Sequence, residues 1–237
     1  MNDNKFIRTE ILIGTAAMER LASATVAVFG VGGVGSFAVE ALARAGIGHL
    51  VLIDKDIVDV TNINRQIHAT TKVIGSSKTE LMKQRILDIN PTVIVDTIDD
   101  FYLPNNESDN DKFFICDYDY VIDAIDTLTS KIDLVVECKR RQIKIISSMG
   151  AGNKLDPTRF KVADIFETNV DPIAKVMRKK LKEQGIDKLK VVYSTEPPIK
   201  IPNSEPKFIG SISFVPSVAG LILAGEVIKS IAGVNLQ

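Results

Sequence analysis

The amino-acid sequence predicts a doubly wound α/β fold built on a mostly parallel sheet. Short apolar runs typical of buried strands alternate with longer segments that have the apolar periodicity of helices. The first run, Thr25–Phe29, ends at the glycine loop Gly30-Val31-Gly32-Gly33-Val34-Gly35, and the second, His49–Ile53, ends at Asp54. An acidic residue about 20 positions beyond such a loop is placed to contact a ribose. The sequence therefore predicts a Rossmann-like nucleotide-binding N-terminal half and a more irregular α/β C-terminal half.

The elements of the first half follow the glycine loop in order. Ser36–Ala45 has an apolar face and stops before Gly46, as helices commonly do at glycine. A second helix is predicted over Lys78–Ile89, where Asn90-Pro91 ends it. The remaining predictions are strands at Val93–Ile98, Tyr120–Ile125 and Lys144–Ser148, a polar loop at Pro104–Lys112 and a helix at Lys131–Arg141.

The second half is less regular. It contains predicted strands at Ala163–Phe166 and Val191–Tyr193, a basic helix at Ile173–Gln184 and a proline-rich extended loop at Ser194–Lys207. The segment Pro216–Ile231 is apolar and helical, with Glu226 and Lys229 within it. Because charges and glycines interrupt it, we expect a buried helix or a peripheral membrane contact rather than a membrane span.

Composition excludes several classes of protein. The 237 residues are 45% apolar and 25% charged, which is ordinary for a globular domain. A formal net charge of −1 excludes a protein that is strongly basic overall, although it permits a local basic patch. Two cysteines, Cys116 and Cys138, exclude a disulfide framework and a four-cysteine zinc site. The N-terminus has no apolar signal segment, so we expect a cytoplasmic protein.

Polar side chains beyond the glycine loop indicate phosphate chemistry. Asn62, Arg65 and Gln66 follow Asp54 closely, so their loop can reach the phosphates of a nucleotide held at the glycines. Arg65 offers a planar fork to a phosphate, and Lys78 offers a compact positive charge. Each of these side chains taken singly fits a solvated surface position. Their combination favours a site that activates ATP.

Two acidic residues, Asp123 and Asp126, close a predicted strand at the carboxyl edge of the sheet. Ligands bind at this edge in doubly wound folds. One of the two carboxylates can hold Mg²⁺ while phosphate oxygens supply other ligands. The alternative for Asp126 is a helix N-cap before Thr127.

The histidines, the cysteines and the basic stretches are weaker candidates. We expect His49 and His68 to be structural, and Cys116 and Cys138 to lie in the core rather than act as nucleophiles. Runs of basic residues are usually solvated helix faces, and the alternative is a patch that binds the RNA backbone. The sequence leaves both readings open for two stretches, Lys139-Arg140-Arg141 with Lys144 and Lys175–Lys190.

The motifs together resemble the ThiF/MoeB/HesA superfamily of adenylating enzymes, which are similar to ubiquitin-activating enzymes. The glycine loop, Asp54, Asn62-x-x-Arg65-Gln66, Lys78 and Asp126 occupy the superfamily's pattern. The chain is similar in particular to the branch that dehydrates threonylcarbamoyladenosine in tRNA. That similarity is carried by Thr61–Ala69, Tyr120–Asp126, Gly150-Ala151-Gly152 with Asp156-Pro157-Thr158, and Tyr193–Glu196, while Gly220-x5-Glu226-x2-Lys229 recurs across the superfamily.

The resemblance implies one domain over residues 1–237, with an ATP-binding half (1–150) and a half for substrate and dimer contacts (151–237). Arg8 matches an arginine that enters the ATP site, commonly from the partner subunit of a homodimer. The implied catalytic set is Arg8, Arg65, Lys78 and Asp126, with Asp126 as the Mg²⁺ ligand. The implied ATP-binding set is Gly30, Gly32, Gly33, Gly35, Asp54, Asn62, Arg65, Gln66 and Lys78.

The implied reaction is an ATP-dependent cyclisation of threonylcarbamoyladenosine in tRNA, through a carboxyl-adenylate that an internal nitrogen displaces. The implied partners are tRNA, a second copy of the chain and a sulfur-relay protein. Some relatives carry a longer cysteine-containing C-terminal segment, where this chain has Phe208-Ile209-Gly210-Ser211, so the contact with a sulfur-relay partner is left open.

Three other functions share parts of the pattern. An enzyme that adenylates the C-terminus of a ubiquitin-like protein would use the same ATP site. However, the chain has no CxxC pair and no cysteine after Cys138, which argues against sulfur transfer and thioester chemistry. An NAD-dependent oxidoreductase would leave Arg65, Lys78 and Asp126 without a role. A non-catalytic nucleotide-binding subunit would be expected to lose those three residues.

Overall fold

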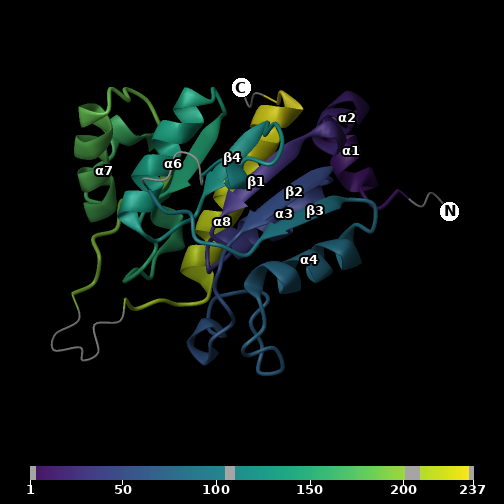
Figure 1. Ribbon diagram of the computed structural model, residues 1–237, viewed down its shortest axis with the longest axis horizontal. Helices are drawn as coiled ribbons and strands as arrows, with labels where there is room; N and C mark the ends of the chain where they lie inside the picture. Colours follow the sequence, from purple (N-terminus) through teal and green to yellow (C-terminus); the bar gives the residue numbers. More distant parts are fainter. Residues whose placement is uncertain (1–3, 105–109, 201–208, 235–237) are drawn as a thin grey trace.

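The computed structural model describes residues 4–104, 110–200 and 209–234. Its centre is a seven-stranded sheet in the order β3-β2-β1-β4-β5-β7-β6, with helices on both faces (Figure 1). All neighbouring strands pair in parallel except β6 with β7, which are antiparallel. The predicted doubly wound, mostly parallel α/β fold is confirmed. The strands are β1 (Thr25–Phe29), β2 (His49–Ile53), β3 (Ile94–Ile98), β4 (Tyr120–Asp123), β5 (Ile145–Ser148), β6 (Phe160–Asp164) and β7 (Lys190–Ser194).

The two faces of the sheet support two separate hydrophobic cores. Because side chains alternate along a strand, Val26 and Val28 of β1 face one core while Ala27 and Phe29 face the other. The first core contains residues of α2 (Thr15–Ser23), α3 (Gly35–Ala45), α4 (Lys78–Ile89) and α8 (Phe214–Ala232). The second contains residues of α6 (Leu128–Arg140) and α7 (Pro172–Glu183). The central strands are therefore covered on both sides, as continuous apolar strand sequences require.

Helix α8 completes the first core by lying directly on α3. Its 19 residues have a mean hydropathy of 1.6, so by length and composition it could cross a membrane. In this structure Val215, Ala219, Leu223 and Val227 are buried in the first core. The expectation of a buried helix is therefore confirmed for this face. A Cβ at Gly220 would lie 2.2 Å from the carbonyl oxygen of Val34, so the two helix backbones approach too closely for any side chain there.

The structure differs from the sequence prediction at several boundaries. Two helices that the sequence analysis did not predict, α1 (Ile7–Ile13) and α2, precede β1. Helix α1 buries no residue, and α2 buries only Ala17 and Leu21, so their core-facing patterns are absent or short. The predicted strand at 163–166 is wrong in position, since β6 ends at Asp164 and the 3-10 turn Ile165–Glu167 follows. Parts of the predicted loops at Pro104–Lys112 and Ser194–Lys207 lie outside the described residues.

The close contact between α3 and α8 predicts that a side chain at Gly220 destabilises the protein. We expect Gly220→Ala to lower the free energy of unfolding by about 1–3 kcal/mol, because the new methyl group overlaps the α3 backbone. Gly225→Ala is the matched control on the same helix, since nothing lies within 4 Å of its Cβ position. That substitution should raise stability by up to about 1 kcal/mol through helix propensity. Urea unfolding followed by circular dichroism measures both; equal shifts would contradict the close packing.

Candidate nucleotide-binding site

A cleft of about 450 Å³ opens at the carboxyl edge of the sheet. It lies where the strand order reverses between β1 and β4, which is the position at which doubly wound folds bind ligands. The loops after β1, β2, β4 and β5 all contribute to its wall. Of the residues predicted to form the site, the cleft is lined by Gly30, Gly32, Gly33, Asp54, Asn62, Arg65, Gln66, Lys78 and Asp126.

The glycines of the loop after β1 have different roles. Gly30 has φ +88°, and a Cβ there would lie 2.6 Å from the carbonyl oxygen of Ala124. A Cβ at Gly35 would lie 1.8 Å from the carbonyl oxygen of Gly30, so both positions allow the chain to turn and pack. At Gly32 the nearest atom would be Nε2 of Gln66 at 3.8 Å, so this glycine keeps the backbone open toward the cleft. Helix α3 begins at Gly35 without a side-chain cap, and although the amide of Ser36 donates to the carbonyl of Gly32 at 3.0 Å, the positive end of the helix dipole favours an anion there.

Asp54 joins the loops that follow β1 and β2. Its carboxylate accepts hydrogen bonds from the amide of Val31 at 2.7 Å and from the amide of Asp56 at 2.8 Å. Burial raises the pKa of the Asp54 carboxyl above its usual value, against the opposing effect of the nearby Lys78 charge. Each carboxylate oxygen accepts more than one hydrogen bond, so the carboxylate can also receive ribose hydroxyls in the cleft.

The Asn/Arg/Gln segment is folded into a compact turn. Asn62 is buried, and its side-chain oxygen closes a capping box with Asp59 around the 3-10 turn Val60–Asn62. Arg65 donates from Nη1 to the carbonyl of Thr61 and to Oδ1 of Asn64, both at 2.9 Å, and its aliphatic part covers Gly33. This turn therefore fixes the base of the arginine and directs its guanidinium to the edge of the cleft.

Lys78 is the first residue of α4 and is almost fully buried. Its Nζ contacts Oδ2 of Asp56 at 2.7 Å. A cation at a helix N-terminus adds to the positive end of the helix dipole, which opposes helix stability and favours anion binding. Asp56, which the sequence analysis did not single out, partly balances this charge at the cleft wall.

The two acidic residues at the end of β4 lie in different surroundings. Asp123 is fully buried and contacts Nζ of Lys131 at 2.9 Å, while accepting hydrogen bonds from Ser147 and from the amide of Ile125. Its oxygens are thus used within the protein, and it is not an accessible Mg²⁺ ligand. Asp126 is exposed in the cleft. The N-cap of α6 is Thr127 and has no side-chain cap, so the N-cap alternative for Asp126 is wrong.

Lys131 holds the turn that presents Asp126. Besides Asp123, its Nζ contacts the carbonyl oxygen of Ile125 at 3.1 Å. Both charged side chains of the pair are at most 2% exposed. Removing one partner of such a pair typically costs about 3–5 kcal/mol, because the other charge stays buried without compensation.

The second half of the chain closes the cleft through the loop after β5. Gly150 and Gly152 line the cleft, and Lys154 supports them by donating from Nζ to the carbonyl of Gly150 at 2.6 Å. Lys154 and Asp171 form a second buried ion pair at 3.5 Å. Asn153 exchanges hydrogen bonds with Gly210 at 2.6 and 2.7 Å, which fixes a distant segment against this loop.

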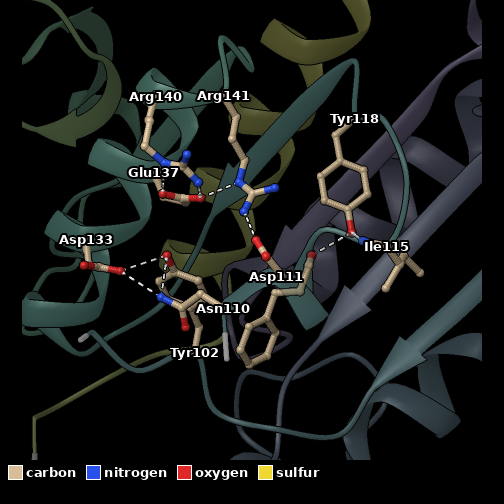
Figure 2. Close-up of polar contacts among 10 residues, drawn as sticks. Tyr102, Asn110, Asp111, Ile115, Tyr118, Asp133, Glu137, Arg140 and Arg141 are labelled. Carbon is tan, nitrogen blue, oxygen red and sulfur yellow. Dashed lines mark hydrogen bonds and ion pairs between the residues drawn. The ribbon is translucent and has the colours of Figure 1, made fainter. Parts of the chain in front are cut away.

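The connection between β3 and β4 supplies cleft residues that the sequence analysis missed. Phe101, Tyr102 and Leu103 line the cleft directly after β3. Tyr102 donates to Asp133 of α6 at 2.8 Å, and Asn110 lies beside both side chains (Figure 2). Burial raises the pKa of the Tyr102 hydroxyl well above its usual value, so it stays a donor. The rule that carboxyl ends of strands carry ligand sites, applied to β3, would have indicated this segment.

Four other residues that the sequence analysis considered lie apart from the cleft. Arg8 is exposed on α1, which packs on α2 beside the amino ends of β1 and β2, at the edge opposite the cleft. Cys138 is buried as expected, but Cys116 is exposed, so its predicted place in the core is wrong. His49 is structural, with Nε2 at 2.8 Å from Oδ2 of Asp96.

Comparisons with known proteins agree with this geometry. A model described as the ThiF family matches residues 7–237. A tRNA threonylcarbamoyladenosine dehydratase of Bacillus subtilis strain 168 is 50% identical, over 96% of this chain and 94% of the relative. A dehydratase of the same name from Escherichia coli K12 is 43% identical, over 81% and 74% of the two chains. Crystal structures of the E. coli dehydratase with AMP and with ATP match with TM-scores of 0.89 and 0.88 at 39% identity, covering 97% of this chain and 94% of that one.

The burial of His68 predicts that the stability of the protein depends on pH. Neither ring nitrogen of His68 has a hydrogen-bond partner among the residues described here. Burial, together with the charges of Lys78 and Arg85, lowers the pKa of His68 from 6.5 to about 4. Between these values the unfolded chain binds a proton and the folded chain does not, so stability falls as pH decreases through this range.

From pH 7.5 to pH 5 the His68 contribution should amount to a loss of about 2 kcal/mol in the free energy of unfolding. His68→Asn should remove this part of the pH dependence of the free energy of unfolding, and the part that comes from the carboxylates should remain. Urea unfolding of both proteins at the two pH values measures the difference. Parallel pH profiles would show that His68 is not buried as a neutral ring.

Proposed function

This chain belongs to the ThiF family, and we propose that it is an ATP-dependent tRNA threonylcarbamoyladenosine dehydratase. The observation that carries the proposal is one cleft that unites the glycine loop, Arg65, Lys78 and Asp126. It is supported by 50% identity, over nearly the full length of both chains, with a relative of that name. ATP is the co-substrate, as it is a ligand in the crystal structure of the E. coli relative.

The cleft suits the two demands of carboxylate activation, which are holding a triphosphate and stabilising the charge that develops on it. The open backbone at Gly32 and the uncapped start of α3 suit phosphate oxygens. Arg65 and Lys78 supply positive charge to the cleft wall, where Asp56 pairs with Lys78, and Asp54 suits the ribose hydroxyls. Fixed donors and cations of this kind act where charge develops, without reorganising during the reaction.

The proposed dehydration proceeds in two steps, adenylation of the carboxylate and ring closure. A carboxylate oxygen of the threonyl group forms a bond to the α-phosphorus of ATP, and the bond to the bridging oxygen breaks, which releases pyrophosphate. A nitrogen of the same threonylcarbamoyl group then attacks the acyl carbon, and the bond to the adenylate oxygen breaks, which releases AMP. The carboxylate oxygen leaves with AMP and the nitrogen loses its proton, so the nucleoside loses one water. Because the attack is intramolecular, proximity supplies much of the rate and no protein nucleophile is required.

Mg²⁺ fits the donor set of the cleft. Asp126 offers an exposed carboxylate there, and the described residues contain no cluster of three or more potential metal-ligating side chains. A single carboxylate combined with substrate phosphates is the usual way in which proteins bind Mg²⁺ beside a nucleotide. When bound, Mg²⁺ would neutralise phosphate charge, while Lys131 keeps the turn that carries Asp126 in place.

Arg8 reaches an ATP site only if it comes from a second copy of the chain. It lies at the opposite edge of the sheet from the cleft of its own chain, so its predicted role requires a homodimer. The side chains of Ile11 and Leu12 on the same helix are 79% and 83% exposed, which supports a partner covering α1. A cytoplasmic location, a sulfur-relay partner and a peripheral membrane contact stay predictions.

The cysteine content favours a dehydratase over an enzyme that adenylates a ubiquitin-like protein and then transfers sulfur. The sequence contains two cysteines and no CxxC pair. Cys138 is buried, and burial raises the pKa of its thiol far above the usual value, so it is not a nucleophile. Neither cysteine lines the cleft.

Two cleft residues provide the first test of the ATP site. Arg65→Ala and Asp126→Ala should each reduce ATP–pyrophosphate exchange by about 100-fold or more, because each removes charge stabilisation at the phosphates. Lys179→Ala and Asp117→Ala are matched controls, since both residues are exposed and neither lines the cleft. Exchange at the wild-type rate in both cleft variants, with an unchanged circular dichroism spectrum, would remove the ATP-site assignment.

The substrate is tested by incubating the purified protein with ATP, Mg²⁺ and tRNA that carries threonylcarbamoyladenosine. Nucleoside mass spectrometry should show an ATP-dependent loss of one water from that nucleoside, with AMP formed in equal amount. An unchanged nucleoside, in a protein that binds ATP, would redirect the assignment to a relative that activates a protein carboxylate.

A further inference from the structure

A second groove lies at the amino edge of the sheet, opposite the cleft. Its volume is about 320 Å³, and its floor contains the first residues of β4 and β5, Tyr120 and Ile145. Four lysines surround this floor: Lys139 from the end of α6, Lys144 before β5, and Lys188 and Lys190 at the start of β7. Folding thus brings two lysines of the first basic stretch beside the last two lysines of the second, which is far away in the sequence.

The positive charge in this groove is largely uncompensated. Among the residues that the structure describes, Lys139, Lys144 and Lys188 are exposed and have no ion pair, and Lys190 contacts Glu226 at 3.2 Å. The neighbouring arginines behave differently. Figure 2 shows Arg140 and Arg141 turned toward Glu137, with Arg141 also reaching Asp111. The chain as a whole has a net charge of −1, so the groove is a local concentration of positive charge.

We propose that this groove binds the phosphate backbone of the tRNA, at a part of the molecule remote from the reacting nucleoside. The inference rests on the proposed function for its RNA partner. Lysine side chains on a rim are suited to phosphates, since each offers a mobile point charge that needs no fixed geometry. Contacts of this kind position a nucleic acid without reading its sequence.

A protein partner fits the groove less well than RNA. Lysine is depleted at protein–protein interfaces, which depend on exposed aromatic or aliphatic anchors. Of the apolar residues that line the groove, Tyr120, Ile145 and Leu189 are at most 7% exposed and Ile143 is half-buried, so the groove offers no large exposed anchor. Nucleic-acid interfaces are instead strongly positive and polar.

The position of the groove agrees with a role beside the cleft. Strands β4 and β5 run from the groove to the cleft and have four residues each, which corresponds to roughly 13 Å. A tRNA is much longer than this, so one molecule can place a nucleoside at one edge while its backbone passes the other edge, on the same subunit or on a second copy. The groove should therefore contribute to affinity for tRNA and not to the chemistry on ATP.

The test compares two double variants that change the charge equally. Lys144→Glu with Lys188→Glu alters the groove, and Lys175→Glu with Lys179→Glu alters exposed positions of α7 that do not line it. Binding of fluorescently labelled, unmodified tRNA is measured by anisotropy over a series of salt concentrations, without ATP. The groove variant should bind tRNA about 10-fold or more weakly than the wild type. The slope of its log binding constant against log salt concentration should be smaller in magnitude by about 1–2, while the affinity of the control variant should stay near that of the wild type.

Equal losses in the two variants, or no loss in the groove variant, would overturn the proposal, as would a wild-type protein that does not bind tRNA. The ATP-induced shift in melting temperature should be the same in all three proteins, which confirms folding. If the glutamates prevent folding, Lys144→Gln with Lys188→Gln replaces them and should still weaken binding several-fold. The assay uses unmodified tRNA and no turnover, so its outcome is independent of whether the nucleoside is dehydrated.

Discussion

The close approach of two loops at the carboxyl edge of the sheet sets the geometry of the whole site. The loop after β1 passes over the loop after β4 with no room for a side chain at Gly30, where the carbonyl of Ala124 would lie 2.6 Å from a Cβ. Backbone hydrogen bonds from Gly30 to Ile53 and from Ala124 to Phe29, both at 2.8 Å, continue the ladder of the sheet up to this point. The start of α3, the Asp54 carboxylate and the Asp126 turn are therefore held on one rigid edge.

Two buried ion pairs support the cleft from beneath. Lys131 and Asp123 hold the turn after β4, and Lys154 and Asp171 hold the loop after β5. In each pair the lysine also donates to a backbone carbonyl of the loop that it supports. Burying these charges is unfavourable unless they are paired, so the pairs restrict the conformation of the loops more than they add stability. A site that aligns a carboxylate with a phosphorus atom needs this kind of restriction.

The basic side chains near the amino edge of the sheet form two groups, one paired with acidic neighbours and one without such partners among the described residues. Arg140 and Arg141 both contact Glu137 of α6, and Arg141 also contacts Asp111, which fixes the segment before β4 to the end of the helix. Lys139, Lys144 and Lys188 have no such partners among the described residues and face one groove. The cleft and the groove then lie at the two ends of the same strands, one suited to the nucleotide and the other to the backbone of a long polyanion.

The sequence by itself was sufficient for the fold class, for the glycine loop and for the polar residues that follow the first two strands. This was possible because strand alternation, helix periodicity and glycine turns are local properties of the chain. The residues alone did not decide between Asp123 and Asp126, although the family resemblance implied Asp126, because only the packing of Lys131 and Ser147 shows that the first carboxylate is used internally. Sequence reasoning also missed Tyr102 and the support that Lys154 gives to the Gly150–Gly152 loop, and it left open whether the two basic stretches bind RNA. Each of these points depends on which parts of the chain meet in space, and that is determined by the order of the strands in the sheet and by the helices packed on them.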